Sequence, residues 1–157
     1  MIPIAEVPHM PSTRCTAAVI ARLQSVGIQT TRQRIAIGQV LLRRPVHMTA
    51  DDILVAARAL LPTLARATVY NTLSVFVEKG LLRVLRLAPE HTVYDSRTEA
   101  HSHLYHEDTG QVQDCAFEGL PRSLMPHIPH HLEVVGVDLM VRVRPKACAI
   151  PSTAPTD

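Results

Sequence analysis

The stretch ARATVYNTLSVFVEKG, residues 65–80, constrains the fold of this chain more than any other. Its apolar side chains recur at the i, i+4, i+7 and i+8 spacing of one helical face: Val69, Leu73, Phe76 and Val77. Gly80 supplies a stop signal, and two β-rich runs follow at once around Ala88-Pro89-Glu90. The pattern predicts an amphipathic helix that leads directly into a β-hairpin.

Three further helices are predicted before this one. The first covers residues 14–26 and ends at Gly27, the second starts at a Thr31 cap, and the third starts at a Thr49 cap. Their expected inward positions are Val19, Leu23, Val26, Ile37, Val40, Leu41, Ile53, Leu54, Ala57 and Leu61. Four helices followed by a hairpin is the order of a winged helix-turn-helix.

The second half of the chain changes to strand patterns. Two strands are predicted on either side of a tight turn at Thr109-Gly110, and a third, long strand over residues 132–144. The prolines between them, Pro121, Pro126 and Pro129, permit at most a short helix. A small sheet with one apolar face needs a covering surface, and a second copy of the chain would provide one. The expected class is α+β, with an N-terminal winged helix-turn-helix and a small C-terminal α/β dimerisation domain.

The expected organisation has four parts. Residues 1–13 form a flexible arm and residues 14–95 a DNA-binding domain, residues 96–145 form a dimerisation and sensing domain, and residues 146–157 a loose tail. Charge follows a similar division. Residues 14–86 hold eleven Lys/Arg against three Asp/Glu, whereas residues 87–157 hold five against ten. The basic half suits a polyanionic partner and the acidic half does not.

Several classes of protein are excluded by pattern. No apolar run is long enough for a membrane span, and the N-terminus lacks the charged start and apolar stretch of a secretion signal. The three cysteines, Cys15, Cys115 and Cys148, are odd in number and far apart, which favours a reducing cytoplasm over a disulfide framework. We therefore expect a cytoplasmic protein.

The outer face of the helix over residues 65–80 suits DNA. It carries no acid before Glu78, and Asn71 and Tyr70 offer contacts to base edges or phosphates. Basic and hydroxyl side chains at the start of the second predicted helix suit phosphate contacts. The candidate DNA-binding residues are Thr31, Arg32, Arg34, Arg66, Thr68, Tyr70 and Asn71. The alternative is an ordinary solvated polar face.

The stretch AHSHLYHEDTGQVQDC, residues 100–115, predicts a metal site. Alternation along a strand places His101 and His103 on one face and His106 on the other. With a two-residue turn, His103 would pair with Ala116, and Asp114 would lie diagonally from His103 on the same face. Imidazole with carboxylate suits Zn, Fe or Mn. The alternative is a strand of surface histidines.

Five segments resemble the ferric uptake regulator family of bacterial metal-responsive transcription factors. They are GIQTTRQRIAI (27–37), HMTADDIL (47–54), ATVYNTLSVFVEKGLL (67–82), YD (94–95) and HSHLYHEDTGQV (101–112). TVYNTL and the ending VDLMVRVR (137–144) look most like the iron response regulator branch. That branch is implied to control iron and haem genes and to respond to haem.

The resemblance implies a homodimer that binds double-stranded operator DNA, with one regulatory metal site at the hinge between its two domains. Carried over by motif, the ligands of a divalent Fe, Mn or Zn ion are His47, Asp95, His101, His103 and Asp114. The expected protein is a metal- or haem-responsive regulator of iron homeostasis genes and not an enzyme.

Three departures from the family pattern bear on the cofactors and on DNA contacts. The first Cys-x-x-Cys pair of many relatives is replaced by His106 and Thr109, so a structural zinc held by four cysteines is excluded. A further family metal site looks lost, because its positions hold Ser102 and Val137. Gln29 stands at a position that is often basic, which weakens an expected minor-groove contact.

Other interpretations stay open. Haem is a possible cofactor, with His103, His106 and His127 as candidate ligands, although no Cys-Pro pair is present. Within the family, the stimulus could be zinc, manganese or peroxide instead of iron. A protein of another class, a metal-dependent hydrolase using His101, His103 and His106, would need an open metal position and a general base.

Overall fold

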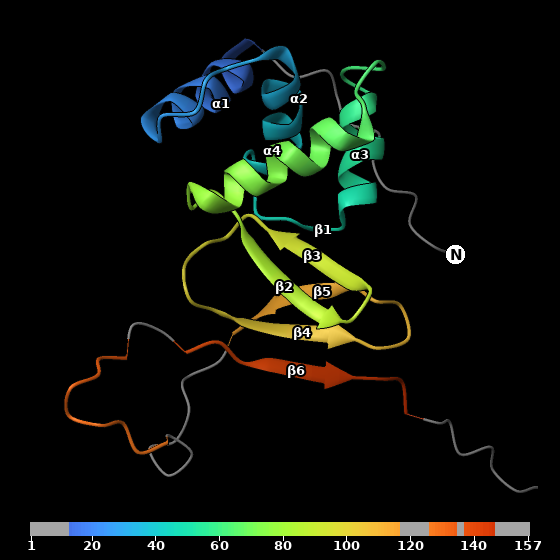
Figure 1. Cartoon of the computed structure of the whole chain (residues 1–157). Coiled ribbons are helices and arrows are strands. Elements are labelled where there is room, and N and C mark those ends of the chain that lie inside the picture. The colour runs from blue at the N-terminus through green and yellow to red at the C-terminus, as the bar shows by residue number, and fades with distance from the viewer. Residues whose placement is uncertain (1–12, 117–125, 135–136, 147–157) are drawn as a thin grey trace, which may run out of the picture. The chain divides into compact units, whose positions relative to one another are not determined.

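The computed structural model describes residues 13–116, 126–134 and 137–146 (Figure 1). The chain divides into two compact units, with the division between Glu99 and Ala100. Most of the expected arm and tail lies outside the described residues, as do Cys148 and Pro121. None of the helices among the described residues has the length and apolar character needed to cross a membrane.

The first unit contains the four expected helices. They are α1 (Thr13–Ser25), α2 (Arg32–Leu41), α3 (Ala50–Arg58) and α4 (Arg66–Glu78). The predicted caps at the starts of α2 and α3 are confirmed: Thr31 Oγ1 accepts from Arg34 N, and Thr49 and Asp52 form a capping box. The predicted stops after α1 and α4 are glycines with positive φ, Gly27 at 72° and Gly80 at 69°.

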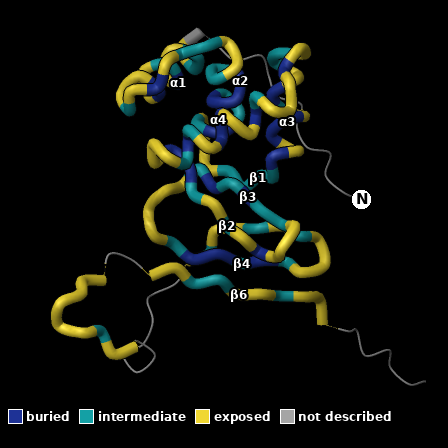
Figure 2. The backbone as a smooth tube through the Cα atoms, viewed as in Figure 1, coloured by how far each residue is buried: buried dark blue, intermediate teal, exposed yellow. Residues whose placement is uncertain are grey.

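The helices enclose one aliphatic core, whose buried backbone segments are dark blue in Figure 2. Leu23 of α1, Ile37 of α2, Ile53 of α3 and Phe76 of α4 have no exposed surface. The predicted inward stripes are therefore confirmed, with Val26, Val40, Leu61 and Val77 only partly buried against this core. Burial of the stripes holds α4 in place while its outer face stays exposed.

A three-stranded sheet completes the first unit. Its strands are β1 (His47–Met48), β2 (Arg83–Ala88) and β3 (His91–Asp95), in the order β1-β3-β2, and all neighbours are antiparallel. The predicted hairpin is β2 and β3, joined at Pro89-Glu90. The two-residue β1 was not predicted, and its pairing places His47 directly opposite Asp95.

The second unit contains another three-stranded sheet. Its strands are β4 (Ser102–His106), β5 (Val112–Cys115) and β6 (Met140–Val143), in the order β5-β4-β6. The predicted long strand over residues 132–144 is wrong in length. Among the described residues, β6 pairs only with the five-residue β4, in parallel from His103–Met140 to His106–Val143, so its partner limits how far it can extend.

The predicted two-residue turn at Thr109-Gly110 is also wrong. His106 pairs with Gln111 across a longer turn, and His103 lies opposite Asp114 instead of Ala116. Gly110 has a φ of +71°, and no non-glycine residue that the structure describes has a positive φ. A tight hairpin turn of the common type needs positive φ at both central residues, which a β-branched Thr109 resists.

Candidate metal centre and DNA-binding surface

In the first unit, an imidazole faces a buried carboxylate. Pairing of β1 with β3 sets His47 Nε2 at 3.5 Å from Asp95 Oδ1. The Asp95 side chain has no exposed surface, and Oδ1 also accepts a hydrogen bond of 2.7 Å from Arg97 N. Burying a carboxylate costs free energy unless hydrogen-bond donors or cations surround it, so a cation at this place would stabilise the Asp95 carboxylate.

In the second unit, two histidines share one face of β4 as predicted. The His101 and His103 rings lie 4.2 Å apart between centroids, and His103 is almost completely buried. Asp114 Oδ1 lies 3.1 Å from His101 Nε2, on the diagonal, although His103 is its neighbour in register. The register differs from the expected one by two residues, which keeps the same side chains on the same face.

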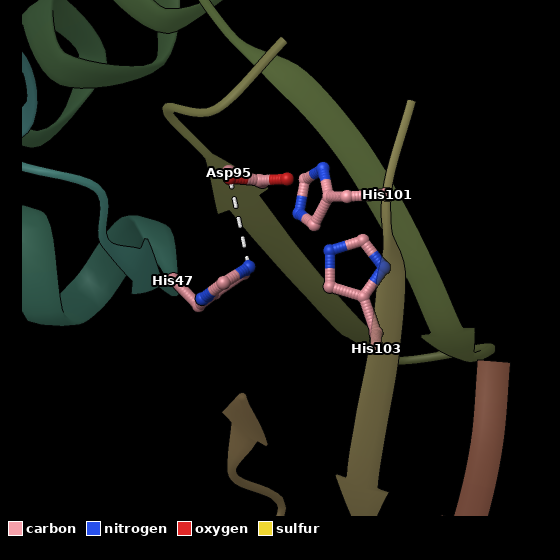
Figure 3. A group of neighbouring side chains, drawn as sticks. All are labelled: His47, Asp95, His101 and His103. Atoms are coloured by element: carbon pink, nitrogen blue, oxygen red, sulfur yellow. Dashed lines mark ion pairs between the residues drawn. The ribbon is translucent and has the colours of Figure 1, made fainter. Parts of the chain in front are cut away.

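Four of the five expected metal ligands come together. The ligand atoms of His47, Asp95, His101 and His103 all lie within 4.8 Å of one another, and Figure 3 shows the four side chains pointing toward one another. Three imidazoles and a carboxylate form a donor set suited to Zn, Fe or Mn. Asp114 is outside this group but contacts His101, in the manner of a carboxylate that orients a metal-bound histidine.

The candidate haem ligands are differently placed. His103 is in the group of four, and His127 is exposed in a segment without helix or strand. His106 is at the end of β4, and its Nε2 is buried without a hydrogen-bond partner among the described residues. Of these three histidines, only His103 belongs to the metal-binding group found in the described part of the chain.

The candidate base-reading residues lie on the outer face of α4. Tyr70 is 42% exposed, Asn71 is exposed, and Thr68 is half-buried beside them. Arg66 opens the helix and contacts Asp51 of α3, with Arg66 Nη2 at 2.9 Å from Asp51 Oδ1. A hydrogen bond to the Tyr70 hydroxyl, followed by the charge of Asp51, raises the pKa of Arg66 above its ordinary value.

Asp51 was missed as a partner of this surface. The sequence showed only an acid in the first turn of α3, where the helix dipole favours one. Nothing in the local pattern indicates that Arg66 lies beside it, because the two residues belong to different helices. The tertiary structure is the only signal for the pair.

The candidate phosphate contacts lie at the start of α2. Thr31 caps the helix, and Arg34 Nη1 donates to the Gln29 carbonyl oxygen at 3.0 Å. Arg32 is exposed in the first turn. An exposed arginine at an N-terminal helix turn can add its charge to the positive end of the helix dipole, which favours an anion there.

Comparison with known proteins decides the family. The model of the ferric uptake regulator family matches residues 25–139, most of the chain. The chain belongs to the ferric uptake regulator family. Members are metal-responsive transcription regulators, so the protein is such a regulator and the alternative of a hydrolase is set aside.

Individual relatives cover most of the chain. The peroxide operon regulator of Bacillus subtilis (strain 168) is 36% identical over 123 residues, which are 73% of this chain and 85% of the relative. The peroxide-responsive repressor PerR of Staphylococcus epidermidis is 32% identical over 126 residues, 75% of this chain and 84% of the relative. Both relatives are named for peroxide, so the expected iron response branch stays a prediction.

A solved relative has the same fold. The ferric uptake regulator of Pseudomonas aeruginosa, solved with manganese, gives a TM-score of 0.62 at 26% identity and covers 82% of this chain and 98% of that chain. The expected α+β class is confirmed, with a winged-helix DNA-binding domain and a small dimerisation domain. The candidate site residues themselves stay predictions.

Proposed function

We propose that the protein is a metal-dependent regulator that binds operator DNA as a homodimer through α4 and controls iron homeostasis genes. One observation carries the metal dependence: His47, Asp95, His101 and His103 bring their ligand atoms within 4.8 Å of one another. The exposed polar face of α4, free of acids before Glu78, supports the DNA contact.

The four side chains would hold one divalent ion, whose positive charge would attract the three imidazole nitrogens and the carboxylate oxygen. Asp95 and His101 stand at the two ends of the segment 96–100, which joins the two compact units. Holding both residues on one ion therefore restrains that segment. A bound metal shifts an equilibrium between two conformations only by the difference in its affinity for them. Couplings of this kind between metal binding and DNA binding are typically about 1–3 kcal/mol.

Metal-dependent DNA binding tests this proposal. Full-length protein is treated with a chelator and then loaded with Mn²⁺ or Zn²⁺, and its binding to promoter DNA is titrated. We expect tighter binding by loaded protein, and loss of that gain in His103→Ala. The matched control is His106→Ala, a histidine of the same strand outside the four-residue group. Metal-independent binding, or equal losses in both variants, would contradict the proposal.

Peroxide is a second candidate stimulus, favoured by the 36% identity to a peroxide operon regulator. Hydrogen peroxide added to Fe²⁺-loaded and to Zn²⁺-loaded protein distinguishes it. Peroxide would be favoured over iron if peroxide released DNA only from the Fe²⁺ form and if promoter occupancy in cells did not change with the iron supply. Occupancy that follows the iron supply alone would favour the iron proposal.

Haem response remains part of the iron proposal, through the resemblance to the iron response branch. We expect added haem to weaken DNA binding and to give the absorption spectrum of an axially ligated iron. His106→Ala and His127→Ala should alter that spectrum if these residues are ligands. An unchanged spectrum in both variants would leave His103 as the remaining candidate ligand, and no haem binding at all would exclude the haem proposal.

A further inference from the structure

The start of α4 lacks the side-chain cap that is present at the starts of α2 and α3. α2 and α3 begin at threonine caps, whereas the N-cap of α4 is Ala65, which makes no side-chain cap hydrogen bond. Like α2, α4 has no acid in its first turn and begins with an arginine, here Arg66, a cation at the positive end of the helix dipole. Such conflicts are expected where function has overridden stability.

An acid from a neighbouring helix faces Arg66. Both carboxylate oxygens of Asp51 contact Arg66 Nη2, at 2.9 and 3.2 Å, and the Tyr70 hydroxyl accepts from the same nitrogen at 3.4 Å. The guanidinium carbon lies 5.7 Å from the centroid of the Tyr70 ring. Within the described part of the chain, Nε and Nη1 of Arg66 have no hydrogen-bond partner. The guanidinium is therefore held at one nitrogen and open at the other two.

Stability does not account for this pair. The Arg66 and Asp51 side chains are 61% and 62% exposed, and ion pairs between exposed side chains add little to the stability of a fold. The consequences for charge and direction are larger. Asp51 cancels the charge of Arg66 in the region that the proposed function places against DNA, and it restricts where the remaining donors point.

We propose that Asp51 is a specificity-determining positioning residue for DNA recognition that acts through Arg66. This proposal rests on the proposed function, in which α4 enters the major groove. Phosphates attract any free cation regardless of sequence, and an arginine neutralised by Asp51 offers them little. A base acceptor in the right place can still accept from the oriented guanidinium, and guanine is the base that arginine contacts most often. Asp51 thus lowers the affinity for non-specific DNA more than the affinity for the operator sequence.

The test compares two DNAs and four variants of the full-length, Mn²⁺-loaded protein. One duplex is selected from a random library by the wild-type protein, and the other is a shuffled duplex of the same composition. The variants are Asp51→Asn, Arg66→Gln, the double variant, and Glu78→Gln as the charge-matched control. Glu78 is an exposed acid at the far end of the same helix.

Asp51→Asn should bind the shuffled duplex about fivefold more tightly. This is the size of the interaction between two unit charges about 4 Å apart in water. Its plot of log affinity against log salt should steepen by about 0.9, one further phosphate contact. The ratio of selected to shuffled duplex affinity should fall, and so should the preference for guanine at the base position that Arg66 contacts. Glu78→Gln should leave both unchanged, and Asp51→Asn should have no effect in the Arg66→Gln background. A fifth variant, Asp51→Ser, repeats the Asp51→Asn test with a different first-turn side chain that also accepts hydrogen bonds.

Three outcomes overturn the inference. One is an equal change for both duplexes in Asp51→Asn, because a simple charge effect leaves the specificity ratio intact. Another is an effect of Asp51→Asn that persists without Arg66. The third is a wild-type protein that selects no sequence, which overturns the proposed function as well. If the wild-type protein selects a sequence but Asp51→Asn leaves the ratio of selected to shuffled duplex affinity unchanged, only this inference is overturned and the proposed function stands.

Discussion

At the scale of single residues, Asn71 and Arg32 are expected to contact DNA in different ways. Asn71→Ala should cost about 1–3 kcal/mol at one base position, because an amide can bind adenine through two hydrogen bonds. Arg32→Ala should weaken all sequences alike and flatten the salt slope by about 0.9, because a phosphate contact reads no base. Binding titrations against single-base variants of the selected duplex, at several salt concentrations, measure both. Equal, sequence-independent losses would refute base reading by Asn71.

Asp95 and Asp114 are both acids near histidines, but the structure gives them different surroundings. Asp95 is fully buried in the four-residue group, whereas Asp114 is partly exposed and lies outside that group, with its Oδ1 at 3.1 Å from His101 Nε2. Asp114→Ala should weaken Mn²⁺ binding about 10–100-fold, the usual effect of losing an orienting carboxylate. Asp95→Ala should weaken it further. Metal titrations of both variants check this, and a larger loss for Asp114→Ala would make Asp114 the ligand.

At the scale of elements, the contact between α1 and α2 depends on a glycine. A Cβ at Gly38 would lie 2.7 Å from Val19 Cγ1, which is too close. Overpacking costs about 1–3 kcal/mol, and the better helix propensity of alanine offsets about 1 kcal/mol of it. Gly38→Ala should therefore lower the free energy of unfolding by up to about 2 kcal/mol.

The same change should stabilise the protein once Val19 is alanine. Urea unfolding of Gly38→Ala, Val19→Ala and the double variant gives the coupling between the two positions. Only the helix-propensity gain of about 1 kcal/mol remains when the clash is absent. Additive effects in this cycle would show that Gly38 is not required by the close packing of α1 on α2.

At the scale of the whole molecule, metal and DNA must affect each other equally. If Mn²⁺ tightens operator binding by a given factor, operator DNA must tighten Mn²⁺ binding by the same factor, typically about 5–150-fold. Calorimetric titration of Mn²⁺ into protein with and without the selected duplex measures the second factor. Unequal factors at equilibrium would mean that the metal acts at more than the one proposed site.

Much of the first unit was predictable, because its signals are local. The inward stripes, the Thr31 and Thr49 caps and the stop at Gly27 follow from helical periodicity and backbone conformation within a few residues. The limits of β6 and the turn before β5 were not predictable. A strand's length depends on its partner, and the turn depends on which residue accepts positive φ.

The sequence by itself determined which side chains share a face. A register error of two residues left Asp114 with His101 and His103, because the side-chain period of a strand is two. Only the tertiary structure placed β1 against β3, so that His47 meets Asp95, and α3 against α4, so that Asp51 meets Arg66. These partners lie far apart in the chain, and their distances depend on how whole elements pack, which local preferences do not encode.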